Sequence, residues 1–182
     1  MTTPHESVVV LSRALDQAGD VLAAVRPDQL RLPTPCEDWT VEQLIGHLLA
    51  DTANFVTMMN GDEPDWSAPP PALPDDFVAA FRSGADDLIH RWHQREGEDA
   101  GPPPDMQTAE FAVYTWDLVR ALGLSTELDP EVAERGLAFM SASLEPEMRG
   151  GAFAAEVEAP AGASPYDRLA AFAGRDPART PA

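Results

Sequence analysis

Apolar residues recur every three or four positions along most of this chain, and this spacing limits the fold more than any other feature of the sequence. A helix with one apolar stripe must bury it against another element, so several such helices in succession favour a bundle. Thr40 and Gln43 form a capping box at one helix start, and Asn60-Gly61 and Gly123 are stop signals. The predicted helices cover about residues 4–26, 40–59, 75–96, 105–122 and 129–144.

The sequence therefore predicts an all-α protein with a four-helix bundle in residues 1–148 and a small C-terminal extension in residues 149–182. In the extension, the alternation of Phe153–Ala159 predicts a short extended segment. Ser164 is placed to cap a last short helix that ends at Gly174. The extension has too few apolar residues to fold alone, so we expect it to pack on the bundle.

Charge and cysteine content exclude several classes of function. The chain has 12 basic and 31 acidic residues, a formal net charge of −19, which argues against binding to nucleic acid or anionic membranes. Cys36 is the only cysteine, so neither an internal disulfide nor a multi-cysteine zinc site can form. No apolar run approaches the roughly 18 residues of a membrane span. We expect no secretory signal, because the first residues show no basic region followed by a long apolar core. We expect a cytoplasmic protein whose partner is a small molecule.

His47 is the first candidate ligand. It lies at the edge of the apolar face of the second helix, in line with Asp51. Ligand sites in bundles form from inward side chains of facing helices, so a groove position between helices suits a ligand. A histidine at the edge of an apolar stripe is also often structural or solvated. The spacing leaves both interpretations open.

The fourth helix carries the other candidates. By their spacing, Glu110, Tyr114 and Asp117 share one flank of this helix, while Phe111 and Leu118 face the core. Glu110 and Tyr114 are one turn apart and are neighbours on the helix surface. Either these side chains contribute to a site, or Glu110 and Tyr114 share a hydrogen bond at a helix interface. In the second case Asp117 is solvated or paired with an arginine.

The remaining histidines and the cysteine are not expected to carry chemistry. His90 and His93 have the spacing of metal ligands, but both point away from the apolar side of the third helix and are predicted to be exposed. Cys36 precedes a helix start, where a thiolate can be stabilised. Its acidic neighbours Glu37 and Asp38 oppose that effect, and no paired base is evident, so we interpret Cys36 as structural.

Taken together, three segments resemble the mycothiol-dependent maleylpyruvate isomerase N-terminal-domain family, within the DinB-like four-helix-bundle superfamily. The first is Thr34–Thr40 together with His47. The second is Glu110–Gly123, EFAVYTWDLVRALG, which is similar to the family pattern E-x3-H-x-W-D-L-x-x-A-x-G. The third, Val157–Pro177, is similar to the tail of an uncharacterised actinobacterial subfamily. The resemblance implies a DinB-like four-helix bundle.

The resemblance also implies a metal site. By position, the family's metal ligands fall on His47, Glu110 and Tyr114, and the third departs from the family histidine. In such relatives a divalent ion, often zinc, is held by three protein groups and keeps open positions for water or substrate. For this chain the resemblance implies zinc or nickel. The resemblance further implies mycothiol as a thiol cofactor. A phenol binds zinc well only as phenolate, and its free pKa of about 10 makes Tyr114 a poor ligand at pH 7.

Two hypotheses about function follow. In the first, the protein is a metal-dependent enzyme that carries out a thiol-linked isomerisation or transfer on a small molecule. In the second, it is a metal-free protein that binds a small ligand or a partner helix, and Tyr114 fills the place of the missing ligand. An exposed face of the bundle could also support a homodimer.

Overall fold

The computed structural model describes residues 4–36, 39–65, 68–69, 72–95, 103–150 and 153–179. Within these ranges the chain forms six α-helices and no β-strand, which confirms the predicted all-α fold. The helices are α1 (Pro4–Ala23), α2 (Val41–Met59), α3 (Phe77–Gln94), α4 (Pro104–Leu122), α5 (Pro130–Ser143) and α6 (Pro165–Phe172). Two short 3-10 helices, Pro27–Gln29 and Pro146–Met148, lie between them. None of the described helices is long and apolar enough to span a membrane.

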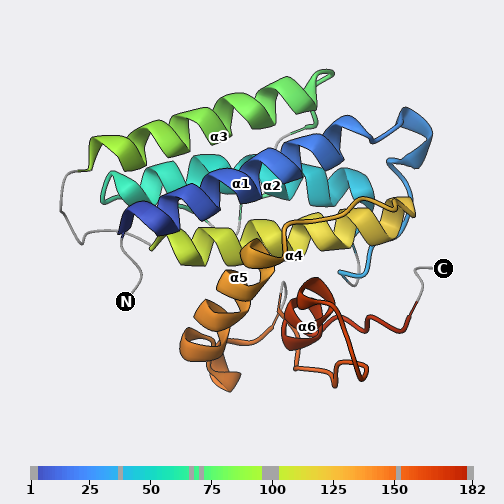
Figure 1. The fold of residues 1–182 in the computed structure, drawn as a ribbon. Helices are drawn as coiled ribbons and strands as arrows, with labels where there is room; N and C mark the ends of the chain where they lie inside the picture. Colours follow the sequence, from blue (N-terminus) through green and yellow to red (C-terminus); the bar gives the residue numbers. More distant parts are fainter. Residues whose placement is uncertain are drawn as a thin grey trace.

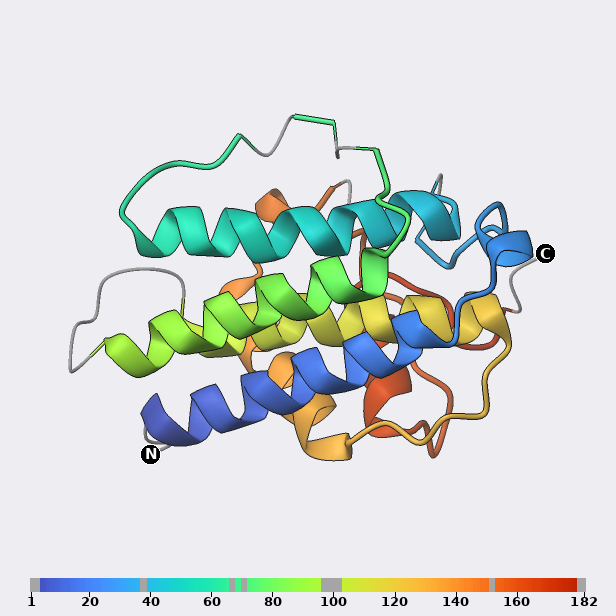
Figure 2. The ribbon, with the colours of Figure 1, turned by 90° about the horizontal axis from the view of Figure 1, so that it is seen from above.

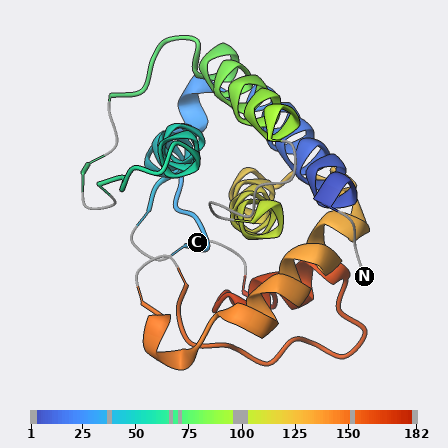
Figure 3. The same cartoon turned by 90° about the vertical axis from the view of Figure 1, so that its left-hand side faces the viewer.

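The first four helices form a bundle, and α5 and α6 cover one side of it. Figure 2 shows α3 between α1 and α2, with α4 behind them, and α1 and α2 both pack on α4. α5 runs across the direction of the bundle and packs on α4 and α6 (Figure 1). Seen along the bundle, α4 therefore lies in the middle of the other helices (Figure 3).

The central position of α4 buries more of its surface than the spacing predicts. Phe111 and Leu118 are in the core, as predicted, and both are fully buried. The flank that carries Tyr114 and Asp117 is buried as well, with exposed fractions of 1% and 0%. A second layer covers this flank, because α2, the loop before it and the segment after α5 pack against Tyr114, and Arg175 pairs with Asp117. Periodicity within one helix does not reveal such a second layer.

The predicted capping box fixes the start of α2. The Gln43 N–H donates to Thr40 Oγ1 at 3.3 Å, and the Thr40 N–H donates to Gln43 Oε1 at 2.9 Å. These two bonds satisfy donors that a bare helix start would leave unpaired. They fix where α2 begins. The helix start in turn determines the direction in which the His47 side chain projects, almost two turns later.

The loop before α2 is held against that helix start. The hydroxyl and the N–H of Thr34 both donate to the carbonyl oxygen of Trp39, at 2.9 and 3.1 Å. The loop therefore closes on itself and carries Trp39 next to α2. Glu37 and Asp38 lie outside the described residues. Cys36 is buried in this loop, and its structural role stays a prediction.

The C-terminal segment returns to the bundle. Phe153–Ala159 lies outside any helix and forms no strand within the described residues. Ser164 caps the start of α6, as predicted, and Gly174 beyond its end has a left-handed φ of +89°. α6 packs on α4 and α5. A boundary between residues 1–148 and 149–182 stays a prediction.

The close approach of α2 and α3 depends on Gly84, and replacing it by alanine should destabilise the fold. A Cβ at this position would lie 2.4 Å from Thr52 Oγ1 and 3.0 Å from Thr52 Cβ. Overpacking of this kind lowers the free energy of unfolding by about 1–3 kcal/mol. Urea denaturation measures the change. The exposed neighbour offers a control, Ser83→Ala, which should alter it by less than about 0.5 kcal/mol. Equal urea midpoints for Gly84→Ala and Ser83→Ala would contradict the close approach of α2 and α3.

Candidate functional site

Three rings meet where α2, α4 and the loop before α2 come together. The imidazole of His47 lies 4.6 Å from the Trp39 ring and 5.0 Å from the Tyr114 ring, between centroids, and it meets Tyr114 edge-on. Trp39 and Tyr114 stack at 6.1 Å with an angle of 27° between their planes. The His47 side chain keeps an exposed fraction of 26%. Facing helices thus bring together two of the three residues to which the resemblance points.

Two carboxyl groups lie beside this histidine. Asp51 Oδ2 is 3.3 Å from His47 Nε2, one turn further along α2. The Asp51 side chain is fully buried, and neither of its oxygens accepts a hydrogen bond from the residues that the structure describes. Glu110, half-buried on α4, lies near enough for its charge to act on Asp51. Buried carboxyl groups are normally hydrogen-bonded, so Asp51 is an exception that needs an explanation.

Burial determines how these groups ionise. It lowers the pKa of His47 to about 4, so the imidazole is neutral at pH 7 and keeps a lone pair for a ligand. It raises the pKa of Glu110 to about 7. Burial, and then the charge of Glu110, raises the pKa of Asp51 well above its ordinary value.

Tyr114 is held as a neutral phenol by the same surroundings. Burial, followed by the negative charges of Glu110 and Asp51, raises the pKa of Tyr114 well above its ordinary value. Among the described residues no hydrogen bond is found between Tyr114 and Glu110 or His47, so the alternative of a Glu110–Tyr114 hydrogen bond at the interface is not observed. Tyr114 contacts its neighbours through its ring, and it forms a wall of the site.

An ion pair with the C-terminal segment lies behind Tyr114. Arg175 Nη2 donates to Asp117 Oδ2 at 2.8 Å, and Arg175 Nε lies 3.2 Å from both Asp117 oxygens. The exposed fractions of the two side chains are 3% and 0%. The guanidinium carbon also lies 6.0 Å from the centre of the Tyr114 ring. Of the two alternatives for Asp117, pairing with an arginine is therefore the one observed.

An apolar cavity of about 240 Å³ opens beside Glu110. Its lining comes from α4, α5 and the segment after them: Met106, Ala109, Glu110, Phe139, Met140, Ser143, Leu144 and Phe153. Phe153 also stacks on Tyr114, with ring centroids 6.3 Å apart. Glu110 thus borders both the cavity and the cluster of His47 and Asp51. A small molecule with an apolar body could lie in this cavity with one end at the carboxyl groups.

Comparison with known proteins gives the family. Residues 11–124 match the family model of the mycothiol maleylpyruvate isomerase N-terminal domain. The chain belongs to this family. Two uncharacterised proteins of Mycobacterium tuberculosis, from strains CDC 1551 and H37Rv, are each 37% identical to it over 179 residues. Each alignment covers 90% of this chain and 94% of the relative. No solved structure matches the chain significantly.

The family match covers the polar cluster and leaves out part of the cavity. His47, Asp51, Glu110 and Tyr114 all lie within residues 11–124. Phe153 and the other cavity residues from α5 lie beyond them, as does Arg175. The cluster therefore belongs to the shared family domain, while the cavity is completed by a segment outside the matched region.

The donor groups of this chain fit a divalent ion if Asp51 takes the place of Tyr114 as a ligand. A neutral imidazole at His47 and a carboxyl at Glu110 suit such an ion, whereas a neutral phenol at Tyr114 does not. Asp51 adds a buried carboxyl whose oxygens accept no hydrogen bond from the described residues. Across the described residues, no three histidine, cysteine, aspartate or glutamate side chains are already arranged around one ion position. His47, Asp51 and Glu110 therefore fit a divalent ion if the Glu110 side chain moves towards the other two.

Sequence reasoning missed part of this site. Asp51 is in line with His47, but nothing in the sequence indicates that it is buried without a partner. The one feature of the sequence that could have indicated Asp51 as a site residue is its position one helical turn after His47. Phe153 and Arg175 lie far along the chain in a segment without regular spacing, so no local pattern connects them with α4. His90 and His93 are exposed, as predicted.

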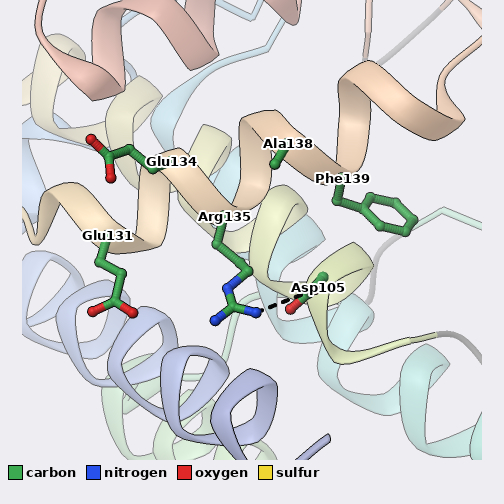
Figure 4. Close-up of a pocket in the computed structure, with 6 residues that line it drawn as sticks. All are labelled: Asp105, Glu131, Glu134, Arg135, Ala138 and Phe139. Atoms are coloured by element: carbon green, nitrogen blue, oxygen red, sulfur yellow. Dashed lines mark ion pairs between the residues drawn. The ribbon is translucent and has the colours of Figure 1, made fainter. Parts of the chain in front are cut away.

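A second depression, beside α5, has a different character. Its lining includes Asp105, Glu131, Glu134 and Arg135, and Figure 4 shows Arg135 reaching from α5 to Asp105 on α4. Their charged atoms are 3.7 Å apart, and Arg135 also donates to Ser7 Oγ at 3.3 Å. The arginine is thus engaged in joining helices, so we do not place a binding site there.

Proposed function

We propose that this protein binds a divalent metal ion with His47 and Glu110 and acts on a small molecule held in the adjoining cavity, in a thiol-linked isomerisation or transfer. One observation carries the proposal: Glu110 borders both the His47 cluster and the apolar cavity. A metal site and a substrate pocket that share one carboxyl have the arrangement that metal-assisted chemistry requires. The family name adds mycothiol as the thiol.

Each residue of the site has a distinct part in this function. His47 is neutral at pH 7 and offers a ring nitrogen, and Trp39 and Tyr114 hold its ring in position. The apolar walls of the cavity exclude water and bind the body of the substrate. A bound divalent ion would supply Lewis-acid activation of a thiol or a water molecule. Glu110 directs that chemistry to the end of the cavity.

Metal content tests the proposal directly. The protein should be purified without a chelator or a histidine tag, supplied with zinc or nickel, and dialysed before elemental analysis. We expect about one equivalent of metal in the wild type and a loss of most of it in His47→Ala and Glu110→Gln. Folded wild-type protein that retains no metal above the level of these variants would contradict the metal-dependent function.

A second candidate function is metal-free binding of a small ligand. One observation favours it: Tyr114, at the position where the resemblance implies a histidine, is buried and packs between His47, Trp39 and Phe153. The apolar cavity would serve such a protein equally well. Ligand binding that is independent of metal, together with absent metal, would favour this function.

Restoring the family histidine should strengthen the site. We expect Tyr114→His to raise the zinc or nickel affinity by at least about tenfold, equivalent to about 1.4 kcal/mol, without loss of helicity. The gain should disappear when His47→Ala is added, because both residues would bind the same ion. Competition titration against a metal indicator measures the affinities. An unchanged affinity in Tyr114→His would contradict the position assigned to the site.

Three further expectations from the sequence stay predictions. These are a cytoplasmic location, a homodimer, and the absence of nucleic-acid partners. The net charge of −19 supports the last of these, because phosphate binding needs a basic surface. Light scattering coupled to size-exclusion chromatography would determine the oligomeric state.

A further inference from the structure

Asp51 is the least satisfied polar side chain of the site. Its exposed fraction is 0%, and both carboxyl oxygens lack a hydrogen-bond partner among the described residues. None of the groups that surround it among the described residues is cationic at pH 7: they are the Glu110 carboxyl and the Tyr114 phenol on α4, and the neutral His47 imidazole on its own helix. Leaving a carboxyl group buried without a donor costs several kcal/mol. A side chain kept in such a place is expected to have a partner that the protein atoms do not provide.

We propose that Asp51 is the third protein ligand of the metal site, so that the ion is held by His47, Asp51 and Glu110. The inference rests on the proposed function, since it assigns a ligand to the same ion. Asp51, on α2, would take over the coordinating role that a histidine on α4 has in the family. One imidazole and two carboxyl groups form a donor set for a divalent first-row ion such as zinc, nickel or manganese.

The geometry of α2 supports chelation by this pair. His47 and Asp51 are four residues apart, so both side chains leave the same face of the helix. The same spacing places two ligands on one zinc ion in helical metalloprotease motifs. Two ligand atoms at about 2.0–2.1 Å from one tetrahedral ion are about 3.3–3.4 Å apart. The observed separation between His47 Nε2 and Asp51 Oδ2 is 3.3 Å.

Tyr114 then has a role other than coordination. Its ring packs edge-on against His47 and stacks on Trp39 and Phe153. These contacts fix the imidazole beside Asp51. Glu110 remains as the side chain that must close on the ion, and it has space beside it because it borders the cavity. Two of the three proposed ligands, His47 and Asp51, are therefore side by side on α2, and the remaining ligand, Glu110, comes from α4.

The test compares zinc affinity in matched variants by competition titration, with thermal melting in the presence and absence of zinc. We expect Asp51→Asn, which keeps the shape of the side chain, to weaken zinc binding by at least about tenfold. Without zinc it should melt no lower than wild type, because it removes an unpaired buried carboxyl. Asp51→Cys supplies another zinc ligand and should retain binding. The control is Glu42→Gln, an exposed carboxyl on the same helix, which should bind zinc as wild type does.

The outcomes separate this inference from the proposed function. If zinc binding requires His47 and Glu110 but is unchanged in Asp51→Asn, the role of Asp51 is wrong and the metal-dependent function stands. If folded wild-type protein binds none of zinc, nickel and manganese, both are wrong. Loss of binding in Asp51→Asn with retention in Asp51→Cys supports Asp51 as a ligand, because a purely structural role would not distinguish these variants in this way.

Discussion

Replacing Arg175 with methionine is expected to lower the free energy of unfolding by about 3–5 kcal/mol at neutral pH, the effect of removing one partner from a buried ion pair. The guanidinium makes its contacts with Asp117 where both side chains are almost fully buried. Without it, Asp117 remains as an uncompensated buried carboxylate. The measurement is urea denaturation of wild type and Arg175→Met. The control, Arg168→Met, removes an exposed arginine from α6 and should change stability by less than about 1 kcal/mol.

The loss should also depend on pH. Burial raises the pKa of Asp117, and Arg175 opposes this rise. In Arg175→Met the folded-state pKa of Asp117 should rise further above its unfolded value. A group of this kind favours the folded state while it is protonated and destabilises it as the pH rises through the folded-state pKa. The difference in the free energy of unfolding between wild type and Arg175→Met should therefore be smaller at pH 5 than at pH 8. A difference that grows towards low pH would contradict the assignment to Asp117.

Deleting residues 150–182 is expected to lower the melting temperature by about 10–20 °C. The segment supplies Arg175 to Asp117 and the fully buried Leu169 to the packing of α6 on α4 and α5. Together these contacts are worth about 5 kcal/mol or more, and each kcal/mol corresponds to roughly 2–4 °C in a chain of this size. Calorimetry measures the shift. An unchanged melting temperature would show that residues 149–182 do not stabilise the bundle.

Helices in this chain could be predicted well because their ends are marked locally. The capping box of Thr40 and Gln43 and the left-handed Gly123 each act within a few residues, and both are found where the sequence placed them. The apolar stripe likewise put His47 at the edge of a buried face, and its side chain is partly exposed. These features depend on neighbours along one helix, which a single sequence contains.

The site itself could be predicted only in part, because it depends on contacts between distant segments. The burial of Asp51 follows from the packing of α2 on α4, and the same residue on an isolated helix would be solvated. The pairing of Asp117 with Arg175 joins residues 58 positions apart. The cavity needs α5 and Phe153 as its far wall. None of these contacts has a local spacing that could reveal it.

An anomalous difference map at the zinc absorption edge, from crystals grown with zinc, would locate the ion and identify its ligands. We expect one strong peak about 2.0–2.2 Å from a ring nitrogen of His47 and from carboxyl oxygens of Asp51 and Glu110, at the end of the apolar cavity. A map with no peak at this position, or with zinc bound only at surface carboxylates, would contradict the metal site and the function built on it.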